Sequence, residues 1–279
     1  MNNTINSELA SVYREWLEAV KQSNGIFCDK SGVEKFSNPY FFGVSDEWNI
    51  EKDGVRILVV GQEGASGHWN AIDMNSDKYI AFDEVEKLQE ASIATVEKRV
   101  GGKDASIDIC GEKHLIKNNH RAFWQFFNRI ATNDKAVEAC PCAWTNIDLV
   151  CYNQKAANRK YKLNETDRKI LHADTIPTIF KRLVDIAKPT HIVFASWRDV
   201  SFDHEFESKP SGFFNDSFKR NGVNSVLLTH LSNIPCLVLY HPQYLKIKKS
   251  FDDVIKTICD YIYDEKKDEN LIETSFKLG

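Results

Sequence analysis

The sequence predicts an α/β protein, a three-layer α/β/α sandwich with a mainly parallel central sheet. Short aliphatic runs alternate with longer stretches of helical periodicity through most of the 279 residues, which is typical of βαβ units. Residues 55–60 include an unbroken run of aliphatic side chains, as expected for a strand that is buried on both faces. The composition agrees, because 42% hydrophobic and 27% charged residues are ordinary for a soluble globular protein.

Helices are predicted where apolar residues recur at helical spacing. The first begins at Ser7, which could cap it, and runs to about Ser23. Further helices are expected at residues 83–99, 119–131, 175–187 and 251–263. Strands are expected at residues 55–60, 142–150, 191–195, 223–231 and 235–240.

We expect a single domain over residues 1–279, because no linker or internal repeat interrupts the alternation of strands and helices. Residues 1–50 read as an N-terminal helix followed by a long loop, and residues 67–142, approximately, as a helical insertion. The segment 264–279 is rich in charge, so it is predicted to be a frayed tail.

Charge and cysteine content narrow the class of protein. The net charge of −4 argues against a protein that coats nucleic acid nonspecifically, although a local basic face remains compatible with it. The start of the sequence does not resemble a signal peptide, and the apolar runs are too short to span a membrane. The seven cysteines are scattered and odd in number, as in a reducing cytoplasm. We therefore expect a cytoplasmic monomer.

Cys140 and Cys142 form the one closely spaced cysteine pair, with Cys110 and Cys151 at irregular distances. Such a group leaves a metal site open as an alternative, but buried free thiols fit the spacing better. We therefore predict no metal and no cofactor.

Three predicted strands end in groups that can do chemistry. Gln62 and Glu63 follow the first strand, Asn146 and Asp148 end a middle strand, and His241 follows a late one. Parallel strands bring their carboxyl ends to one edge of the sheet, so these residues could line a single pocket. Each has an ordinary alternative: a glycine turn after the strand, an asparagine in a turn, and a histidine in the core.

The order of these motifs resembles the uracil-DNA glycosylase superfamily over roughly residues 55–260. Members have a strand ending in a Gly-Gln-Asp-Pro-Tyr-His type motif, a middle strand ending in a base-reading Asn, and a late strand ending in His-Pro-Ser. The corresponding segments here are Gly-Gln-Glu-Gly-Ala-Ser at 61–66, Thr-Asn at 145–146 and His-Pro-Gln at 241–243. No motif matches letter for letter.

The resemblance implies a role for each matching residue. Glu63 falls where the family has its water-activating acid, and it could also stabilise the positive charge of the oxocarbenium-like sugar. His241 would donate a hydrogen bond to the base oxygen on which negative charge develops. Asn146 would read the Watson–Crick edge of a base turned out of the duplex, and Gln62 would contribute its backbone amide.

The departures from the family pattern suggest a different substrate. Ala65 stands where the uracil enzymes carry a Tyr that excludes thymine, and Gly64 replaces the neighbouring Pro. Both changes remove volume where a C5 substituent would point. Asp148 could accept a hydrogen bond from the amino group of cytosine, whereas it would repel the O4 atom of uracil. We therefore expect a C5-modified pyrimidine, such as hydroxymethylcytosine or its glucosylated form in phage DNA, and a role in anti-phage defence.

DNA is the expected partner, and the segment after His241 is the expected contact. Gln243, Tyr244 and Leu245 occupy the loop that the family wedges into the minor groove, and either Tyr244 or Leu245 could fill the gap left by the flipped base. Lys246 and Lys248 follow and could bind phosphates. The alternative is a capped start to the last helix.

Other functions stay open at this point. One alternative is uracil excision in base-excision repair, with a divergent motif. A second is a catalytically inactive nucleic-acid-binding module of the same fold. A third is an unrelated doubly wound hydrolase that uses Glu63 and His241 on a small ligand.

Overall fold

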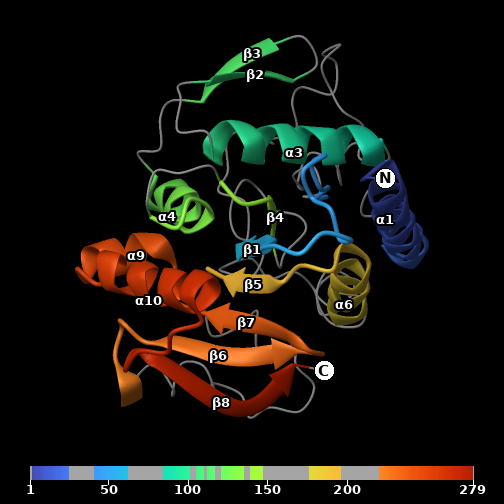
Figure 1. Ribbon diagram of the computed structural model, residues 1–279. Coiled ribbons are helices and arrows are strands. Elements are labelled where there is room, and N and C mark those ends of the chain that lie inside the picture. The colour runs from blue at the N-terminus through green and yellow to red at the C-terminus, as the bar shows by residue number, and fades with distance from the viewer. Residues whose placement is uncertain are drawn as a thin grey trace.

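A six-stranded sheet lies at the centre of the computed structural model, which describes residues 2–24, 41–61, 84–100, 105–109, 112–116, 121–134, 139–146, 176–195 and 220–278. The strands of this sheet are β1 (Ile57–Gly61), β4 (Cys142–Asn146), β5 (His191–Phe194), β6 (Val226–Leu231), β7 (Ile234–Val238) and β8 (Leu271–Leu278). They follow one another across the sheet in the order β4-β1-β5-β7-β6-β8 (Figure 1).

The sheet is mainly parallel, as predicted. β1 pairs in parallel with β4 on one side and with β5 on the other, and β5 pairs in parallel with β7. β6 is antiparallel to β7 and parallel to β8. Every residue of β1 is buried, which explains why its sequence is aliphatic throughout rather than alternating.

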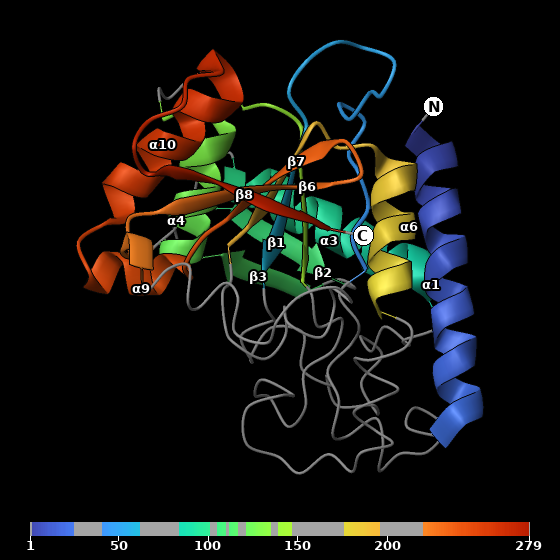
Figure 2. The same ribbon diagram turned by 90° about the horizontal axis from the view of Figure 1, so that it is seen from below.

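The helices form layers on the two faces of the sheet. They are α1 (Asn2–Asn24), α3 (Val85–Val100), α4 (Ala122–Ala131), α6 (Ile176–Ala187), α9 (Pro242–Ile247) and α10 (Phe251–Asp264). Figure 2 shows α4, α9 and α10 on one face and α1 and α6 on the other. In Figure 1, α3 lies beyond β4 at the edge of the sheet. The predicted arrangement of a mainly parallel sheet with helices on both faces is therefore confirmed.

Aromatic side chains attach α1 to the loop that precedes β1. Tyr13 stacks on Phe41 with ring centroids 4.2 Å apart, and Trp16 meets Phe41 edge-on at 6.0 Å. Asn6 holds the same loop through its side chain, donating to Val44 O at 3.0 Å and accepting from Val44 N at 2.8 Å. α1 begins at Asn2, so Ser7 lies inside the helix and the prediction that Ser7 caps its start is wrong. Asn6, which precedes Ser7, already belongs to the helix and contacts the loop.

Two expectations about chain organisation need correction. The insertion between β1 and β4 is not helical throughout, because β2 (Ala105–Ile109) and β3 (Glu112–Ile116) form an antiparallel hairpin between α3 and α4. The segment 264–279 is not a frayed tail, because β8 pairs with β6 from Val226 and Leu271 to Leu231 and Leu278. The charged sequence hid a strand whose first residue, Leu271, is buried.

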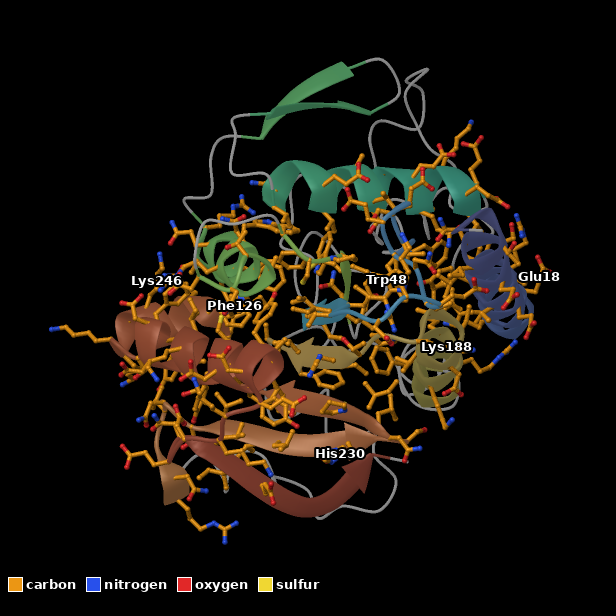
Figure 3. The ribbon with its side chains drawn as sticks, viewed as in Figure 1. Glu18, Trp48, Phe126, Lys188, His230 and Lys246 are labelled. Carbon is orange, nitrogen blue, oxygen red and sulfur yellow. The ribbon has the colours of Figure 1, made fainter. Side chains whose placement is uncertain are left out.

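Buried apolar side chains from the sheet and from both helical layers form one continuous core. Phe126 of α4 packs between the sheet and α10, where its ring meets that of Phe251 at 6.4 Å (Figure 3). On the other face, Trp48 is fully buried and donates from Nε1 to the carbonyl of Ala187 at 2.8 Å. The core thus holds the layers on both faces of the sheet in a fixed relation to the strand ends.

Candidate functional site

The carboxyl ends of the parallel strands meet at one edge of the sheet. Gly61 at the end of β1 is in register with Asn146 at the end of β4. On the other side of β1, Ala195 N donates to Val60 O at 2.9 Å, and Leu239 N donates to Phe194 O at 3.1 Å. β1 lies between β4 and β5, so the order of the strands along the chain reverses at β1. Such a reversal opens a crevice at the carboxyl edge, where ligands bind in open α/β sheets.

Asn146 is a buried side chain at this edge, and Gly61 makes room for it. A Cβ atom added at Gly61 would lie 2.5 Å from Asn146 Oδ1, so only glycine accommodates the amide in its present position. Asn146 is 2% exposed, and its Nδ2 has no hydrogen-bond partner within the described part of the chain. A buried amide donor without a partner costs about 1–3 kcal/mol, which makes it a candidate for ligand binding.

His241 stands at the same edge, beyond the end of β7, as the N-cap of α9. Its Nδ1 accepts a hydrogen bond from the backbone N–H of Gln243 at 3.2 Å. A neutral imidazole that accepts at Nδ1 carries its proton on Nε2. The cap therefore fixes the tautomer in which Nε2 is a hydrogen-bond donor, as the predicted role of His241 requires.

Phe123 in the first turn of α4 links the two candidate residues. Its ring lies 6.3 Å from that of His241 at an interplanar angle of 23°, and 6.3 Å from that of Trp144, which precedes Asn146 by two residues. Phe123 is half-buried, whereas its neighbours Phe126 and Phe127 are fully buried. All three residues lie in the stretch 119–131, where apolar spacing predicted a helix. Only the contacts of Phe123 set it apart, so the sequence held no signal for this residue.

Asn146 and His241 follow strands that are not neighbours in the sheet. β4 and β7 are separated by β1 and β5, so their backbones lie roughly 14 Å apart at about 4.8 Å per strand. Phe123 contacts His241 and Trp144 from α4. Asn146 offers an amide, His241 offers Nε2–H, and Phe123 offers the face of a ring.

Four predicted site residues lie outside the described residues. They are Gln62, Glu63, Ala65 and Asp148. Their predicted roles in activating water and shaping the base pocket stay predictions. Gly61 and Asn146, the last described residues before them, lie at the carboxyl edge of the sheet.

The segment after His241 forms the short helix α9 and corrects one prediction. Leu245 is fully buried, so it cannot enter DNA and its predicted role as a wedge is wrong. Tyr244 is half-buried and its ring lies 5.0 Å from that of Tyr240. Gln243 is exposed. Ile247 is 66% exposed, and no other large apolar side chain is exposed in the described ranges.

The lysines of α9 differ in their surroundings. Lys246 lies between α9 and α4 (Figure 3), where its Nζ bonds to Gln125 Oε1 and lies 4.8 Å from the centroid of the Phe251 ring. Lys248 is exposed, and its Nζ lies 5.4 Å from the centroid of the Tyr244 ring. Lys248 is therefore the more accessible cation for a phosphate.

Two further features of the described residues concern their helices and their metal-ligating side chains. None of the helices there has the length and apolar character needed to cross a membrane. Nor do three His, Cys, Asp or Glu side chains come together there in a way that could hold a metal ion.

Compared with protein-family models, curated proteins and solved structures, the chain has no match. The groups that the fold brings to the carboxyl edge are therefore the basis for a functional proposal.

Proposed function

We propose that this chain is a DNA glycosylase that turns a pyrimidine out of DNA, hydrolyses its N-glycosidic bond and leaves an abasic site. We further propose that the base carries a C5 substituent, as in hydroxymethylcytosine or glucosylated hydroxymethylcytosine, and that the enzyme acts against phage DNA. The observation that carries the proposal is the buried, unpaired Nδ2 of Asn146 within the described residues, at the carboxyl edge of the sheet.

An amide suits the Watson–Crick edge of a pyrimidine. It presents one donor and one acceptor side by side, and cytosine presents N3 as an acceptor next to its N4 amino donor. The Nδ2 of Asn146 would donate to the base and satisfy the hydrogen bond that it lacks among the described residues. A base can reach such a buried group only after it has left the stack.

His241 and Phe123 complete the proposed base site. As the glycosidic bond breaks, negative charge develops on the O2 oxygen of the leaving pyrimidine, and a donor fixed in place before the reaction stabilises that charge. His241 supplies this donor at Nε2, since its Nδ1 is engaged by Gln243 N. Phe123 would stack on the flipped base, because its ring is half-buried and lies next to that of His241.

Three further residues enter the proposal from the sequence alone. Glu63 would activate the attacking water and stabilise the charged sugar. Ala65 would leave space for the C5 substituent, and Asp148 would accept from the amino group of cytosine. No metal or cofactor is needed for this reaction.

DNA contact is assigned to the exposed part of α9. Ile247 is 66% exposed and lies between Lys246 and Lys248 in the sequence. An apolar side chain inserted between base steps can hold the gap that a flipped nucleotide leaves. We propose that Ile247 provides this wedge in place of Leu245, while Lys248 and the side chain of Gln243 meet the backbone.

The test is a base-release assay with mass-spectrometric detection of free bases. The DNA substrates contain uracil, thymine, cytosine, hydroxymethylcytosine or glucosylated hydroxymethylcytosine. Release of the modified cytosines is expected, and Glu63→Ala should abolish it. Asn146→Ala should slow release by about 100-fold, because it removes a donor from the transition state.

Thr145→Val is the matched control for Asn146→Ala. Thr145 is the preceding residue of β4, it is 1% exposed, and strand alternation turns it to the opposite face of the sheet. This variant should keep the activity. Release of uracil alone would contradict the modified-base proposal and support repair. No release from any substrate, with DNA binding unchanged by Glu63→Ala, would support an inactive binding module.

A further inference from the structure

Two thiols lie together at the end of β4 that is opposite to Asn146. Cys140 Sγ lies 3.7 Å from Cys142 Sγ, with Pro141 between the two residues in the chain. Cys140 is half-buried, while Cys142 is 7% exposed. The proposed glycosylase chemistry uses neither thiol.

The backbone fixes this pair in place. Cys140 N donates to the carbonyl of Ala131 at 2.9 Å, at the end of α4. The carbonyl of Pro141 accepts from Ile57 N at 3.0 Å, at the start of β1. Both thiols are therefore held between a helix and the sheet, and a disulfide would bring the sulfur atoms from 3.7 Å to the bonding distance of about 2 Å.

Tyr263 of α10 places a hydroxyl beside Cys140. Its Oη lies 3.2 Å from Cys140 Sγ, and it also lies 2.7 Å from the carbonyl of Ile130 and 3.1 Å from that of Ala131. One hydroxyl has one proton to share among these acceptors. When Cys140 ionises, its thiolate becomes the strongest of the three, and the hydroxyl can turn to it.

The two thiols differ in acidity. The hydrogen bond from Cys142 lowers the pKa of the Cys140 thiol; burial opposes this, and the hydrogen bond from Tyr263 adds to the lowering. Burial raises the pKa of the Cys142 thiol well above its ordinary value, and the interaction with Cys140 raises it further. Cys140 is thus the thiol that ionises first, and Cys142 is the one that keeps its proton.

Cys140 is also the thiol that a small molecule can reach. A hollow of about 500 Å³ is lined by Cys140, Tyr263, Glu47 and residues at the end of α4, whereas Cys142 does not line it. Glu47 and Tyr263 are the other titratable groups on this lining, and the carboxylate disfavours anionic reagents. A neutral, small electrophile fits the site best.

We propose that Cys140 and Cys142 form a peroxide-reactive dithiol, a modification site that a small hydroperoxide enters through this hollow. Cys140 Sγ attacks the terminal peroxide oxygen: the S–O bond forms, the O–O bond breaks, and the leaving oxygen takes a proton to become an alcohol or water. Cys142 Sγ then attacks the sulfenic sulfur of Cys140: the S–S bond forms, the S–O bond of the sulfenic acid and the S–H bond of Cys142 break, and the hydroxyl takes that proton and leaves as water. The dithiol loses two protons and two electrons in total, and these reduce the peroxide to an alcohol or water and a second molecule of water.

The first test uses the wild-type protein and hydrogen peroxide at less than one equivalent. Cleavage before aspartate residues releases the fragment of residues 134–147, which contains Cys140 and Cys142 but not Cys151. This fragment should lose the mass of two hydrogens, while the peptides that carry Cys236 and Cys259 stay reduced. A fragment that keeps both thiols while other cysteines oxidise would overturn the proposal.

Variants then assign the order of events. Cys142→Ser should trap the sulfenic acid, so dimedone should label Cys140, whereas Cys140→Ser should leave Cys142 unlabelled. Tyr263→Phe should slow alkylation of Cys140 at neutral pH by about threefold to tenfold, since the thiolate loses a donor. Labelling of Cys142 in preference to Cys140 would overturn the assignment, and circular dichroism of each variant checks that it is folded.

Discussion

Gly61 and Asn146 face each other across β1 and β4, and each limits what the other can be. The missing Cβ at position 61 leaves the space that Asn146 Oδ1 fills. In return, a polar side chain occupies a place in the core where an apolar one would be more stable. A strand end that keeps a buried amide without a partner among the described residues is more easily explained by binding than by folding.

A double-mutant cycle tests this dependence. Gly61→Ala alone should lower the free energy of unfolding by about 1–3 kcal/mol, because its Cβ would overlap Asn146 Oδ1, 2.5 Å away. In the Asn146→Ala background the same change should be nearly neutral, because the nearest remaining atom, Trp144 Nε1, is 3.5 Å away. Urea unfolding of the four proteins gives the coupling energy. Additive effects would show that the two positions are independent.

His191 at the start of β5 should make stability depend on pH. Burial lowers the pKa of His191 to about 4, while its ring meets Tyr261 edge-on at 6.1 Å. An unfolded histidine titrates near 6.5, so between about pH 6.5 and 4 the unfolded chain binds a proton that the folded chain does not. The titration of His191 should therefore not lower the free energy of unfolding above pH 6.5, and it should lower this free energy by about 2–3 kcal/mol as the pH falls to 4.

Urea unfolding at several pH values checks this prediction. His191→Asn cannot titrate, so the difference in stability between pH 7 and pH 4.5 should be smaller in the variant than in the wild type. Equal differences in the two proteins would mean that His191 does not contribute to the acid sensitivity.

At the scale of helices, Arg129 joins the end of α4 to the start of α10. It binds Asp134 through two parallel bonds, Nε to Oδ1 at 2.7 Å and Nη2 to Oδ2 at 2.8 Å, and it also bonds to Asp252. Its guanidinium lies 5.6 Å from the ring centroid of Phe251. A planar guanidinium between two carboxylates and a ring is the geometry in which an ion pair contributes measurably to stability.

Arg129→Met keeps the apolar stem and removes the charge. It should reduce the free energy of unfolding by about 1 kcal/mol at pH 7. The bond from Arg129 lowers the pKa of Asp134, so this contribution is complete above the ordinary range of aspartate and is lost as the pH falls through the lowered pKa. Thermal unfolding at pH 7 and pH 2.5 should therefore show a difference between the proteins that shrinks in acid.

Arg182→Met provides the comparison for this experiment. Arg182 pairs with Glu15 at 2.6 Å between α6 and α1, but both side chains are exposed, at 43% and 60%. Its removal should change stability by less than about 0.5 kcal/mol. A constant loss in Arg129→Met at both pH values would assign its effect to packing rather than to charge.

The helices also show where prediction from sequence stops. Apolar periodicity found α4, α6 and α10 with ends within a few residues, because each buries one face against the sheet. Side-chain roles within a helix depend on its starting residue. α9 begins at Pro242, which turns Leu245 into the core and leaves Ile247 exposed. A proline is common at the first position of a helix, and a capped helix start here was the alternative to the predicted loop. Phe123 likewise became a candidate only through its contact with His241.

For the whole molecule, the sequence predicted the parallel sheet because its central strands are buried on both faces. It also placed Asn146 and His241 at one edge, since parallel strands share the direction of their carboxyl ends. It missed β8, because the charged residues around Leu271 suggest a solvated tail. This segment is a strand because it pairs with β6, and local composition does not predict pairing between segments that are distant in the sequence.

β8 protects the edge of β6, so its loss should affect the entire protein. Val226 N donates to the carbonyl of Asn270 at 2.8 Å at the point where this pairing begins, and Leu271 is 8% exposed. A chain that ends at Asp264 would leave the backbone groups and apolar residues of β6 uncovered. We expect a lower Tm and aggregation that increases with protein concentration, because an open strand edge pairs with other chains.

Light scattering during a thermal melt measures both effects of this truncation, and point variants separate packing from chain length. Leu271→Ala should lower the free energy of unfolding by about 2 kcal/mol, because a buried leucine loses its contacts. Glu269→Ala, an exposed position just before the strand, should not change it. If the truncated chain melts and scatters like the full chain, residues 265–279 add nothing to the sheet. The expected result would instead show that β8 stabilises the sheet. β8 pairs with β6 and β6 pairs with β7, so β8 would also help to hold β7, the strand that precedes His241 at the carboxyl edge.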